Sequence, residues 1–508
     1  MQPNTRIAVN TLAIYTRLLI TIFVSLFSTR YVLLALGATD FGIYNLVAGV
    51  VALFAFISNT MAGTTQRYIS YNMGVGDVSQ VARVFYCSYI MHLMIAVVVF
   101  ILIEIGGVYF ISNVLSIPDG RYDDALFVLH CVSAGLMCTI MTVPYEAVLM
   151  AHENIVYVSV VVVLHSVIKL VGAIGLLYIG GDRLRLYAVI MAIIPLITLA
   201  LQYVFCKKRY SEVNFEWQRI TDFSLFKDMC RYAGWVLIGV MCATFRTQGA
   251  AILLNVFYGV IANAANGVAM QINGVMQQFS TSITTSIRPQ LIKSAGEKNM
   301  DRMLSLTYAA CKYPFLLLGL LAIPLIIAMP YVLELWLKEV PENTVVFCRL
   351  LLVNLMCIQA TKGITAAIEA TGKVKTLHMT VGLFHIVSLP IAYILFRLGA
   401  PAQTIFLCII GESIASSVFR VILAKYLVDF SILKYLFSVL CRALFVFVIE
   451  GFIGLLLWSA LPHNFIGLII MCLGAAISFI IGTITCGLTK RERQQVYNWV
   501  NRVYKKII

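Results

Sequence analysis

The first long apolar stretch of the chain, residues 9–36, has the sequence VNTLAIYTRLLITIFVSLFSTRYVLLAL. It is longer than the roughly 20 apolar residues that an α-helix needs to cross a bilayer. Polar side chains recur in it at helical spacing, so they share one face of the helix. They are Asn10, Arg17, Thr21, Ser25 and Ser28. Because a polar stripe facing lipid is unfavourable, this stretch predicts a transmembrane helix whose polar face meets protein or water.

Similar apolar stretches continue almost to the end of the chain. The sequence is 61% hydrophobic and only 12% charged, which is more apolar surface than a water-soluble domain can cover. We therefore expect an all-α polytopic membrane protein with about fourteen transmembrane helices. The predicted helices are residues 9–36, 42–63, 83–112, 124–150, 154–179, 185–206, 228–256, 260–288, 302–335, 344–371, 374–397, 401–425, 433–460 and 464–487.

Lysines and arginines are distributed unequally between the two sets of loops. Most of them fall on the face that carries the N-terminus, whereas the opposite face holds only Arg121, Arg183, Arg185, Lys338 and Arg397. Cation-rich short loops stay in the cytoplasm, so both termini are predicted to be cytoplasmic. This bias also accounts for most of the formal charge of +14, and no nucleic-acid partner is needed to explain it.

An internal repeat relates the first six predicted helices to the next six. At an offset of about 220 residues, Asn45-Leu-Val-Ala falls on Asn266-Gly-Val-Ala and Arg67 falls on Arg288. Because six helices return the chain to the same side, both copies have the same orientation in the membrane. We expect an N-lobe (1–206), a cytoplasmic linker (207–227), a C-lobe (228–427), two added helices (428–487) and an amphipathic cytoplasmic tail (488–508).

Cations at bilayer depth are the candidate substrate-binding residues, because such charges are unfavourable unless they serve a path. Arg17 lies roughly 12 Å and Arg246 roughly 15 Å from the nearer end of its helix, at 1.5 Å per residue. Arg30 lies nearer the outer surface and off the polar stripe. Arg67 and Arg288 lie at cytoplasmic helix ends, where anchoring to lipid phosphates is the alternative. The full set of candidates is Arg17, Arg246, Arg30, Arg288, Arg67, Lys169, Lys312 and Lys362.

A second polar stripe and three acids complete the candidate site. The stripe contains Asn266, Asn273, Gln277, Thr281 and Thr284, and with Thr21, Ser25 and Ser28 it is expected to line a cleft between the lobes. The alternative is that these groups only join helices to one another. Glu412, Glu104 and Glu450 are candidates for ion coupling, and an ion pair between Glu104 and Lys169 is the alternative for those two. The histidines and the thirteen cysteines show no metal-site spacing, so neither a metal nor a cofactor is expected.

Two segments resemble a known family. They are RYVLLALGATDFGIYNLV at 30–47 and QRYIS at 66–70, and they stand in a chain with a 6+6+2 helix pattern. Together they resemble the Wzx-type O-antigen and capsule repeat-unit flippases of the multidrug/oligosaccharidyl-lipid/polysaccharide (MOP) superfamily, which have a MATE-like fold. The resemblance implies a cargo of undecaprenyl-pyrophosphate-linked oligosaccharide in the bacterial cytoplasmic membrane. It also implies a role in lipopolysaccharide synthesis, with a polysaccharide polymerase and a chain-length regulator as partners.

Three other functions remain open at this point. A lipid II flippase would carry the same pyrophosphate, and a cation-coupled drug exporter would favour acids over arginines in its cleft. A membrane polysaccharide polymerase or ligase would need a large external loop bearing catalytic groups, whereas the predicted outer loops are short. The excess of deep cations favours a transporter of anionic cargo that works by alternating access, and not an enzyme.

Overall fold

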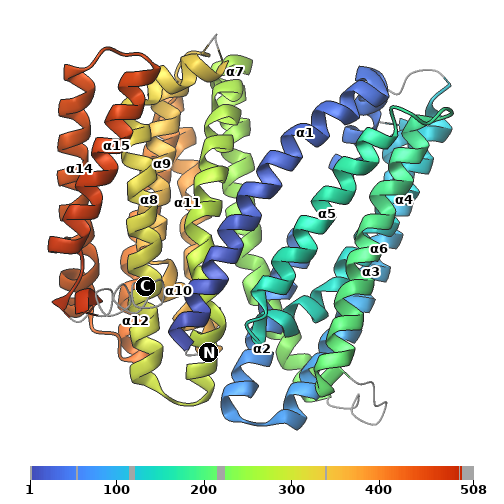
Figure 1. Ribbon diagram of the computed structural model, residues 1–508, viewed down its shortest axis with the longest axis horizontal. Helices are drawn as coiled ribbons and strands as arrows, with labels where there is room; N and C mark the ends of the chain where they lie inside the picture. The colour runs from blue at the N-terminus through green and yellow to red at the C-terminus, as the bar shows by residue number, and fades with distance from the viewer. Residues whose placement is uncertain are drawn as a thin grey trace, which may run out of the picture. The chain divides into compact units, whose positions relative to one another are not determined.

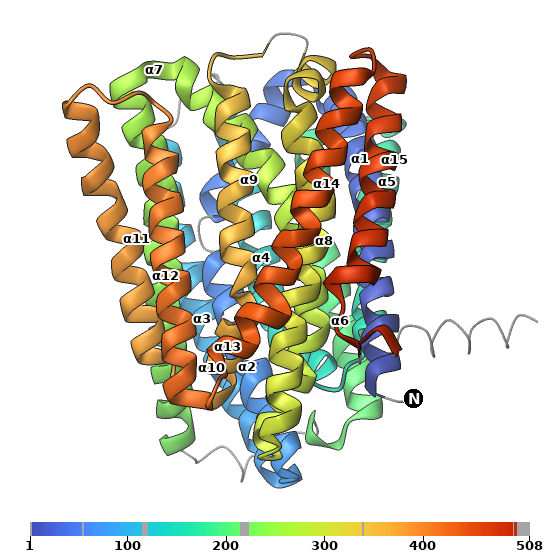
Figure 2. The ribbon, with the colours of Figure 1, turned by 90° about the vertical axis from the view of Figure 1, so that its left-hand side faces the viewer.

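The computed structural model describes residues 3–52, 55–113, 120–213, 223–337, 340–490 and 492–494 (Figures 1 and 2). The chain divides into two compact units. Unit 1 is Met1–Leu237 with Ile292–Asn299, and unit 2 is Ile238–Leu291 with Met300–Ile508. Within the described ranges both units are built from helices and turns, without a strand.

Unit 1 is organised around α4, which packs against α2, α3 and α6, while α1 runs along α5. Two apolar clusters fill it, one around Ile103 and Leu129 and the other around Phe85 and Val148. A 3₁₀ turn at Ser211–Val213 follows the last of its six helices. The helices are α1 Pro3–Ala52, α2 Ala55–Val75, α3 Val78–Asn113, α4 Tyr122–Ala151, α5 Ile155–Gly175 and α6 Arg183–Arg209.

In unit 2, α8 packs against α9 and α10, and α12 packs against α9 and α11. The last two long helices, α14 and α15, lie side by side and contact α8, as Figure 2 shows. Its helices are α7 Phe223–Gly296 (which begins in unit 1), α8 Met300–Leu337, α9 Thr344–Ala360, α10 Lys362–Thr371, α11 Val374–Arg397, α12 Thr404–Val428, α13 Ile432–Tyr435, α14 Cys441–Ala460 and α15 Phe465–Gly482.

A single glycine interrupts each of the two longest helices. Gly37 breaks α1 with φ 74° and ψ 173°, and Gly259 breaks α7 with φ 77° and ψ −169°. A positive φ is accessible to glycine and strained for residues that carry a Cβ. Gly259 follows Gly37 by 222 positions, so the same backbone conformation recurs at the offset of the internal repeat.

Eleven helices among the described residues are long and apolar enough to cross a membrane, or twelve if the bent pair α9–α10 forms one span. The predicted ranges 42–63 and 260–288 are also helical where they are described, but they are not among these spans. Large apolar side chains such as Phe23, Ile105 and Val448 are mostly exposed on the helices. The chain is therefore an all-α, multi-pass membrane protein, as its hydropathy predicted.

Two predicted segments are only partly described. In the predicted linker, α6 continues to Arg209 and α7 begins at Phe223, while residues 214–222 lie outside the described residues. The predicted amphipathic tail is described at 488–490 and 492–494 alone. Its helical surface character thus remains a prediction.

Candidate functional site

The deepest predicted cation of unit 2, Arg246 of α7, is bound to an acid of α12. Its Nη1 lies 2.5 Å from Oε2 of Glu412, and both side chains are largely buried. The second carboxylate oxygen of Glu412 lies 2.9 Å from Nδ1 of His385 on α11. Three helices thus contribute to one charged group inside the helical bundle.

A second arginine extends this group along α12. Arg420 is two helical turns from Glu412, is 8% exposed and interacts electrostatically with both Glu412 and Arg246. Its Nη1 donates to Oγ1 of Thr361, at the break between α9 and α10. The hydroxyls of Thr361 and Ser417 lie 3.1 Å apart, which further joins the α9–α10 break to α12.

The network continues along α10. Lys362 interacts electrostatically with Glu369, Arg420 and Arg288. Nη2 of Arg288 donates to Oε2 of Glu369 at 3.1 Å, and Nε2 of His378 lies 3.7 Å from the other oxygen of that carboxylate. The chain of contacts therefore runs through α7, α10, α11 and α12.

Positive charge exceeds negative charge in this unit-2 network, which we define by eight residues. It contains four cations, two carboxylates and two histidines, a surplus of two positive charges when the histidines are neutral. The cations are Arg246, Arg288, Lys362 and Arg420; the others are Glu369, Glu412, His378 and His385. A site of this composition is suited to an anion, because arginine binds phosphate or carboxylate with two parallel hydrogen bonds.

In unit 1, Arg17 of α1 is half-buried and interacts electrostatically with Glu146 of α4. Arg67 of α2 is 7% exposed, and its guanidinium lies among the rings of Tyr68, Tyr71 and Tyr232 at 4.7, 5.1 and 5.2 Å. Cation–π contacts of this kind stabilise a charge removed from water. Arg67 is thus enclosed by protein, and Arg17 is enclosed in part.

Other predicted binding residues lie apart from these groups. Lys312 of α8 is 1% exposed, and its Nζ lies 2.6 Å from the Glu492 carboxylate, so it secures the described start of the tail. Lys169 is half-buried on α5 and interacts electrostatically with His165. Arg30 is exposed on α1. No contact joins these three cations to the unit-2 network among the described residues.

The predicted acids have different surroundings. Glu104 contacts Nδ1 of His130 at 2.6 Å and Oγ of Ser133 at 2.5 Å, so its partners are on α4 and the proposed Lys169 ion pair is not formed. Glu450 of α14 is fully buried, and neither of its carboxylate oxygens has a hydrogen-bond partner in the described structure. Only Glu412 of the three lies in the unit-2 network.

The predicted polar stripes have mixed exposure. Ser28 and Thr284 are buried and make no side-chain hydrogen bond with a described residue, and Asn273 Oδ1 is equally without one. The hydroxyls of Thr21 and Thr281 bond to carbonyls of their own helix. Ser25 and Gln277 are exposed, and Asn266 is 8% exposed. Buried amides and hydroxyls of this kind remain candidates for binding polar cargo.

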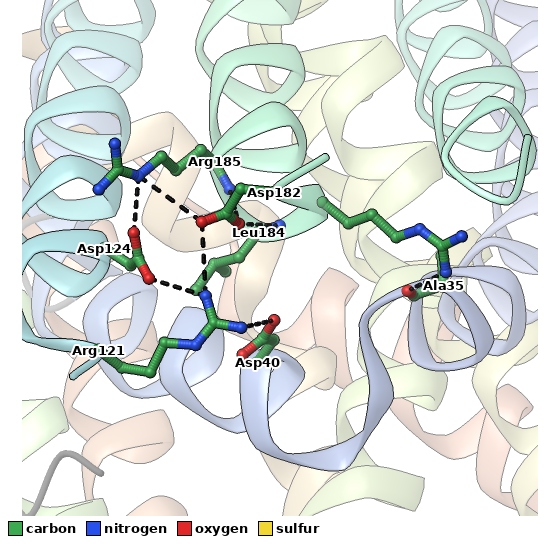
Figure 3. A network of polar contacts seen from close by, with 8 residues as sticks. Ala35, Asp40, Arg121, Asp124, Asp182, Leu184 and Arg185 are labelled. Atoms are coloured by element: carbon green, nitrogen blue, oxygen red, sulfur yellow. Dashed lines mark hydrogen bonds and ion pairs between the residues drawn. The ribbon is translucent and has the colours of Figure 1, made fainter. Parts of the chain in front are cut away.

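Figure 3 shows a separate charged cluster in unit 1, which joins α1 to the starts of α4 and α6. Arg121 binds Asp124 at 2.7 Å and Asp40 at 3.1 Å, and Nε of Arg185 binds Asp124 at 2.6 Å. Arg183 donates to the carbonyl of Ala35, close to the break in α1. These contacts hold α1, the start of α4 and the start of α6 together, so we assign the cluster a structural role.

Sequence reasoning did not identify Glu146 or Arg420. Glu146 stands in an apolar helix beside Pro144 and Tyr145, and nothing in its spacing indicates the partner on α1. Arg420 lies near the end of its span, where an anchoring role is the default. His378 and His385 lie seven residues apart on α11, and each faces a carboxylate. The described residues contain no group of metal-ligating side chains.

No family model matches the chain. Its sequence is similar to that of the uncharacterized membrane protein EpsK of Bacillus subtilis (strain 168), with 18% identity over 315 residues. The match covers 62% of this chain and 62% of EpsK, so it spans less than two thirds of that relative's length.

Solved structures with the same architecture are membrane transporters. A MATE mutant superposes with a TM-score of 0.73 at 15% identity, covering 84% of this chain and 97% of the other. An outward-facing multidrug resistance MATE family transporter of the MOP superfamily superposes with a TM-score of 0.70 at 15% identity, covering 84% of this chain and 96% of the other. A MOP superfamily transporter from Pyrococcus furiosus superposes with a TM-score of 0.71 at 14% identity, covering 84% of this chain and 96% of the other. The chain therefore has the MATE fold, a fold with two lobes of six helices.

Proposed function

We propose that the protein is a flippase that moves undecaprenyl-pyrophosphate-linked oligosaccharide across the bacterial cytoplasmic membrane. The MATE fold supports a transporter, because its two parallel lobes suit alternating access to a site near the middle of the membrane. We further propose that both termini are cytoplasmic. A polysaccharide polymerase and a chain-length regulator would then act on the exported units.

The observation that carries this proposal is the surplus of cations in the unit-2 network. A pyrophosphate loses its hydration when it leaves the membrane surface, so it needs compensating charge along its path. Arg246 and Arg420 offer planar forks that match phosphate oxygens, and Glu412 neutralises part of their charge when no cargo is bound. The cargo then displaces an internal counter-ion, which avoids leaving bare cations in the bilayer.

The sugars of the cargo need a different kind of partner. Asn266, Asn273 and Thr284 lie on α7, the helix that also carries Arg246 and Arg288. Amides and hydroxyls can donate to and accept from sugar hydroxyls. We propose that this stripe contacts the oligosaccharide while the polyprenyl chain stays in the lipid.

The alternatives differ in the charge of their cargo. A drug exporter for organic cations would be expected to present a surplus of acids, whereas the unit-2 network has a surplus of cations. The structure of the P. furiosus transporter is described as showing a reverse polarity of the binding pocket that suggests a different function, so a changed charge on this fold has a precedent. A lipid II flippase remains an alternative, because its cargo carries the same pyrophosphate.

Deletion of the gene tests the proposal. We expect lipid-linked repeat units to accumulate intact on the cytoplasmic side, measured by comparing intact spheroplasts with lysed ones after treatment with an impermeant glycosidase. Restored access in the complemented strain is the control. Repeat units that reach the outer face unpolymerised would favour a polymerase or ligase instead. Unchanged repeat units with lipid II trapped inside would favour the lipid II flippase.

A further inference from the structure

A cavity of about 510 Å³ lies at the end of unit 1 where the chain begins. Its wall is formed by the start of α1, the turn between α4 and α5, and the end of α6. Its size is within the range of roughly 300–1,000 Å³ that is common for small-molecule sites. We call it the N-terminal pocket, and its wall includes Arg6, Asn10, Asn154, Arg209 and Tyr210.

The wall of the N-terminal pocket carries an excess of positive charge. Arg6 of α1 and Arg209 of α6 contribute two guanidinium groups, and Glu153 contributes the one carboxylate among the lining residues. His152 also lines the pocket, but its Nε2 lies 2.5 Å from the Glu212 carboxylate outside the wall. The pocket is therefore electrostatically suited to an anion.

The N-terminus of α5 adds to this potential. Asn154 occupies the N-cap position, but its side chain accepts no hydrogen bond from the helix, and its amide nitrogen donates to the Tyr210 hydroxyl. The first amides of a helix have no partner within it, and they carry partial positive charge. Because Asn154 and Val156 both line the pocket, this uncapped helix end lies at its wall.

The polar wall is held in place before any ligand arrives. The ring of Tyr210 stacks on His152 with centroids 4.1 Å apart and an angle of 19° between the planes. Asn10 is 4% exposed and donates to the Glu153 carbonyl at 3.1 Å, which fixes a turn whose Glu153 has φ 60°. A preformed wall loses little conformational entropy when it binds.

The rim of the pocket is apolar, and it lies where membrane-spanning helices end. Val9 and Val156 line the pocket and are 38% and 44% exposed. Arg6 immediately precedes the span Val9–Gly37, and Arg209 ends the span Arg183–Arg209. This position places the cations at the depth of lipid headgroups, with apolar surface on the side of the hydrocarbon.

We propose that the N-terminal pocket binds the phosphate group of a membrane lipid. Two sources share this chemistry: the bulk anionic phospholipid and a lipid-linked pyrophosphate. Arg17 follows Asn10 by seven residues on the same face of α1, roughly 10 Å further along the helix. If the proposed function holds, the pocket is the first site that binds the cargo on its path to Arg17. This role depends on the proposed function, whereas phosphate-lipid binding by the pocket does not.

Native mass spectrometry of the full-length protein in neutral detergent tests the proposal. The probes are dioleoyl phosphatidylglycerol, undecaprenyl pyrophosphate and, as a phosphate-free control, dioleoylglycerol. We expect one phosphate lipid to be retained, and the Arg6→Gln/Arg209→Gln variant to retain it about tenfold more weakly because two charge-assisted contacts are lost. The matched variant Lys207→Gln/Lys208→Gln removes the same charge from residues of α6 that do not line the pocket, and should bind within about twofold of the unmodified protein.

Glu153→Gln supplies a change in the opposite direction, which misfolding cannot imitate. Removing the one carboxylate from the wall should strengthen retention of both phosphate lipids. A preference for undecaprenyl pyrophosphate identifies a cargo station, and equal retention identifies a general headgroup site; both support the proposal. Equal losses in the two double variants, or retention of dioleoylglycerol as strong as that of the phosphate lipids, would overturn it. If the protein binds phosphate lipids as expected but does not transport repeat units, the proposed function is contradicted and the proposal for the N-terminal pocket is not.

Discussion

At the scale of single residues, three of the predicted cations face an acid. Arg246 has Glu412, Arg288 has Glu369, and Arg17 has Glu146 as an electrostatic partner. A buried charge without a partner is strongly destabilising, whereas a buried pair contributes little net stability. We infer that these acids keep the cations tolerable inside the bilayer when no cargo is bound. An anionic cargo must then compete with a carboxylate for each guanidinium.

Arg246 should be essential for transport. We expect Arg246→Ala to abolish or sharply reduce export of repeat units, and Arg246→Lys to restore it only in part, since lysine keeps the charge and loses the planar fork. The measurement is surface polysaccharide at matched protein level. Arg502→Ala and Lys505→Ala on the predicted tail are the controls and should export nearly normally. Normal export by an Arg17→Ala/Arg246→Ala double variant would contradict the anionic path.

The pair of His152 and Glu212 should make unit 1 sensitive to acid. Burial alone would raise the pKa of Glu212, but the contacts with His152 and the backbone outweigh it, so the pKa is lowered from its ordinary value of 4.5. The folded state then binds this proton less readily than the unfolded state, and the stabilisation is lost as the pH falls below about 4.5. Thermal melting in detergent between pH 7 and pH 3 measures this.

Glu212→Gln provides the comparison for that melting series. The variant lacks the titrating carboxyl, so it should be less stable than the unmodified protein at pH 7 and should lose less stability on acidification. Parallel melting curves for the two proteins across the whole range would show that Glu212 does not contribute to the acid sensitivity.

At the scale of helices, two glycines allow a close crossing within unit 1. A Cβ on Gly74 of α2 would lie 2.1 Å from the carbonyl oxygen of Lys293, and one on Gly296 would lie 2.1 Å from that of Tyr71. Both neighbours are backbone atoms, so they cannot move aside as a side chain could. The end of α2 and the end of α7 therefore pack backbone to backbone, as small residues permit in membrane proteins.

Gly74→Ala should destabilise unit 1 by about 1–3 kcal/mol, because the added methyl group overpacks this crossing. The matched control is Gly267→Ala on α7, where an added Cβ meets no atom within 4 Å. That control should be neutral or stabilise by up to about 1 kcal/mol, since glycine is unfavourable within a helix. Melting temperatures in detergent would decide, and a Gly74→Ala protein as stable as the control would refute the crossing.

Hydropathy predicted the helices well and their connections less well. Apolar runs located α4, α8 and α11 within a few residues, because lipid imposes length and composition on each span. The joins at Gly37 and Gly259 were expected to be loops, since a sequence does not distinguish a glycine in a loop from one at a kink between two helical segments. The partners of Arg17 and Arg246 depend on packing between helices, which a single sequence does not reveal.

At the scale of the whole molecule, the predicted orientation in the membrane is open to direct measurement. Cysteine at Ser116, in a background with fewer native cysteines, should react with an impermeant thiol reagent from outside the cell. This follows from the cation-poor loops on that face. Cysteine at Lys298, between α7 and α8, is the matched control and should react only after permeabilisation. The reverse pattern would invert the predicted topology.

The glycine breaks in α1 and α7 also bear on how the chain enters the membrane. Gly37 and Gly259 each end a predicted span, and the helix resumes at once, with no loop between the two segments. No linker separates the two segments of each pair. During synthesis the first segment therefore cannot move far from the second while the second enters the bilayer. We therefore expect the two segments of each pair to be inserted together, and we expect both joints to tolerate an epitope tag poorly.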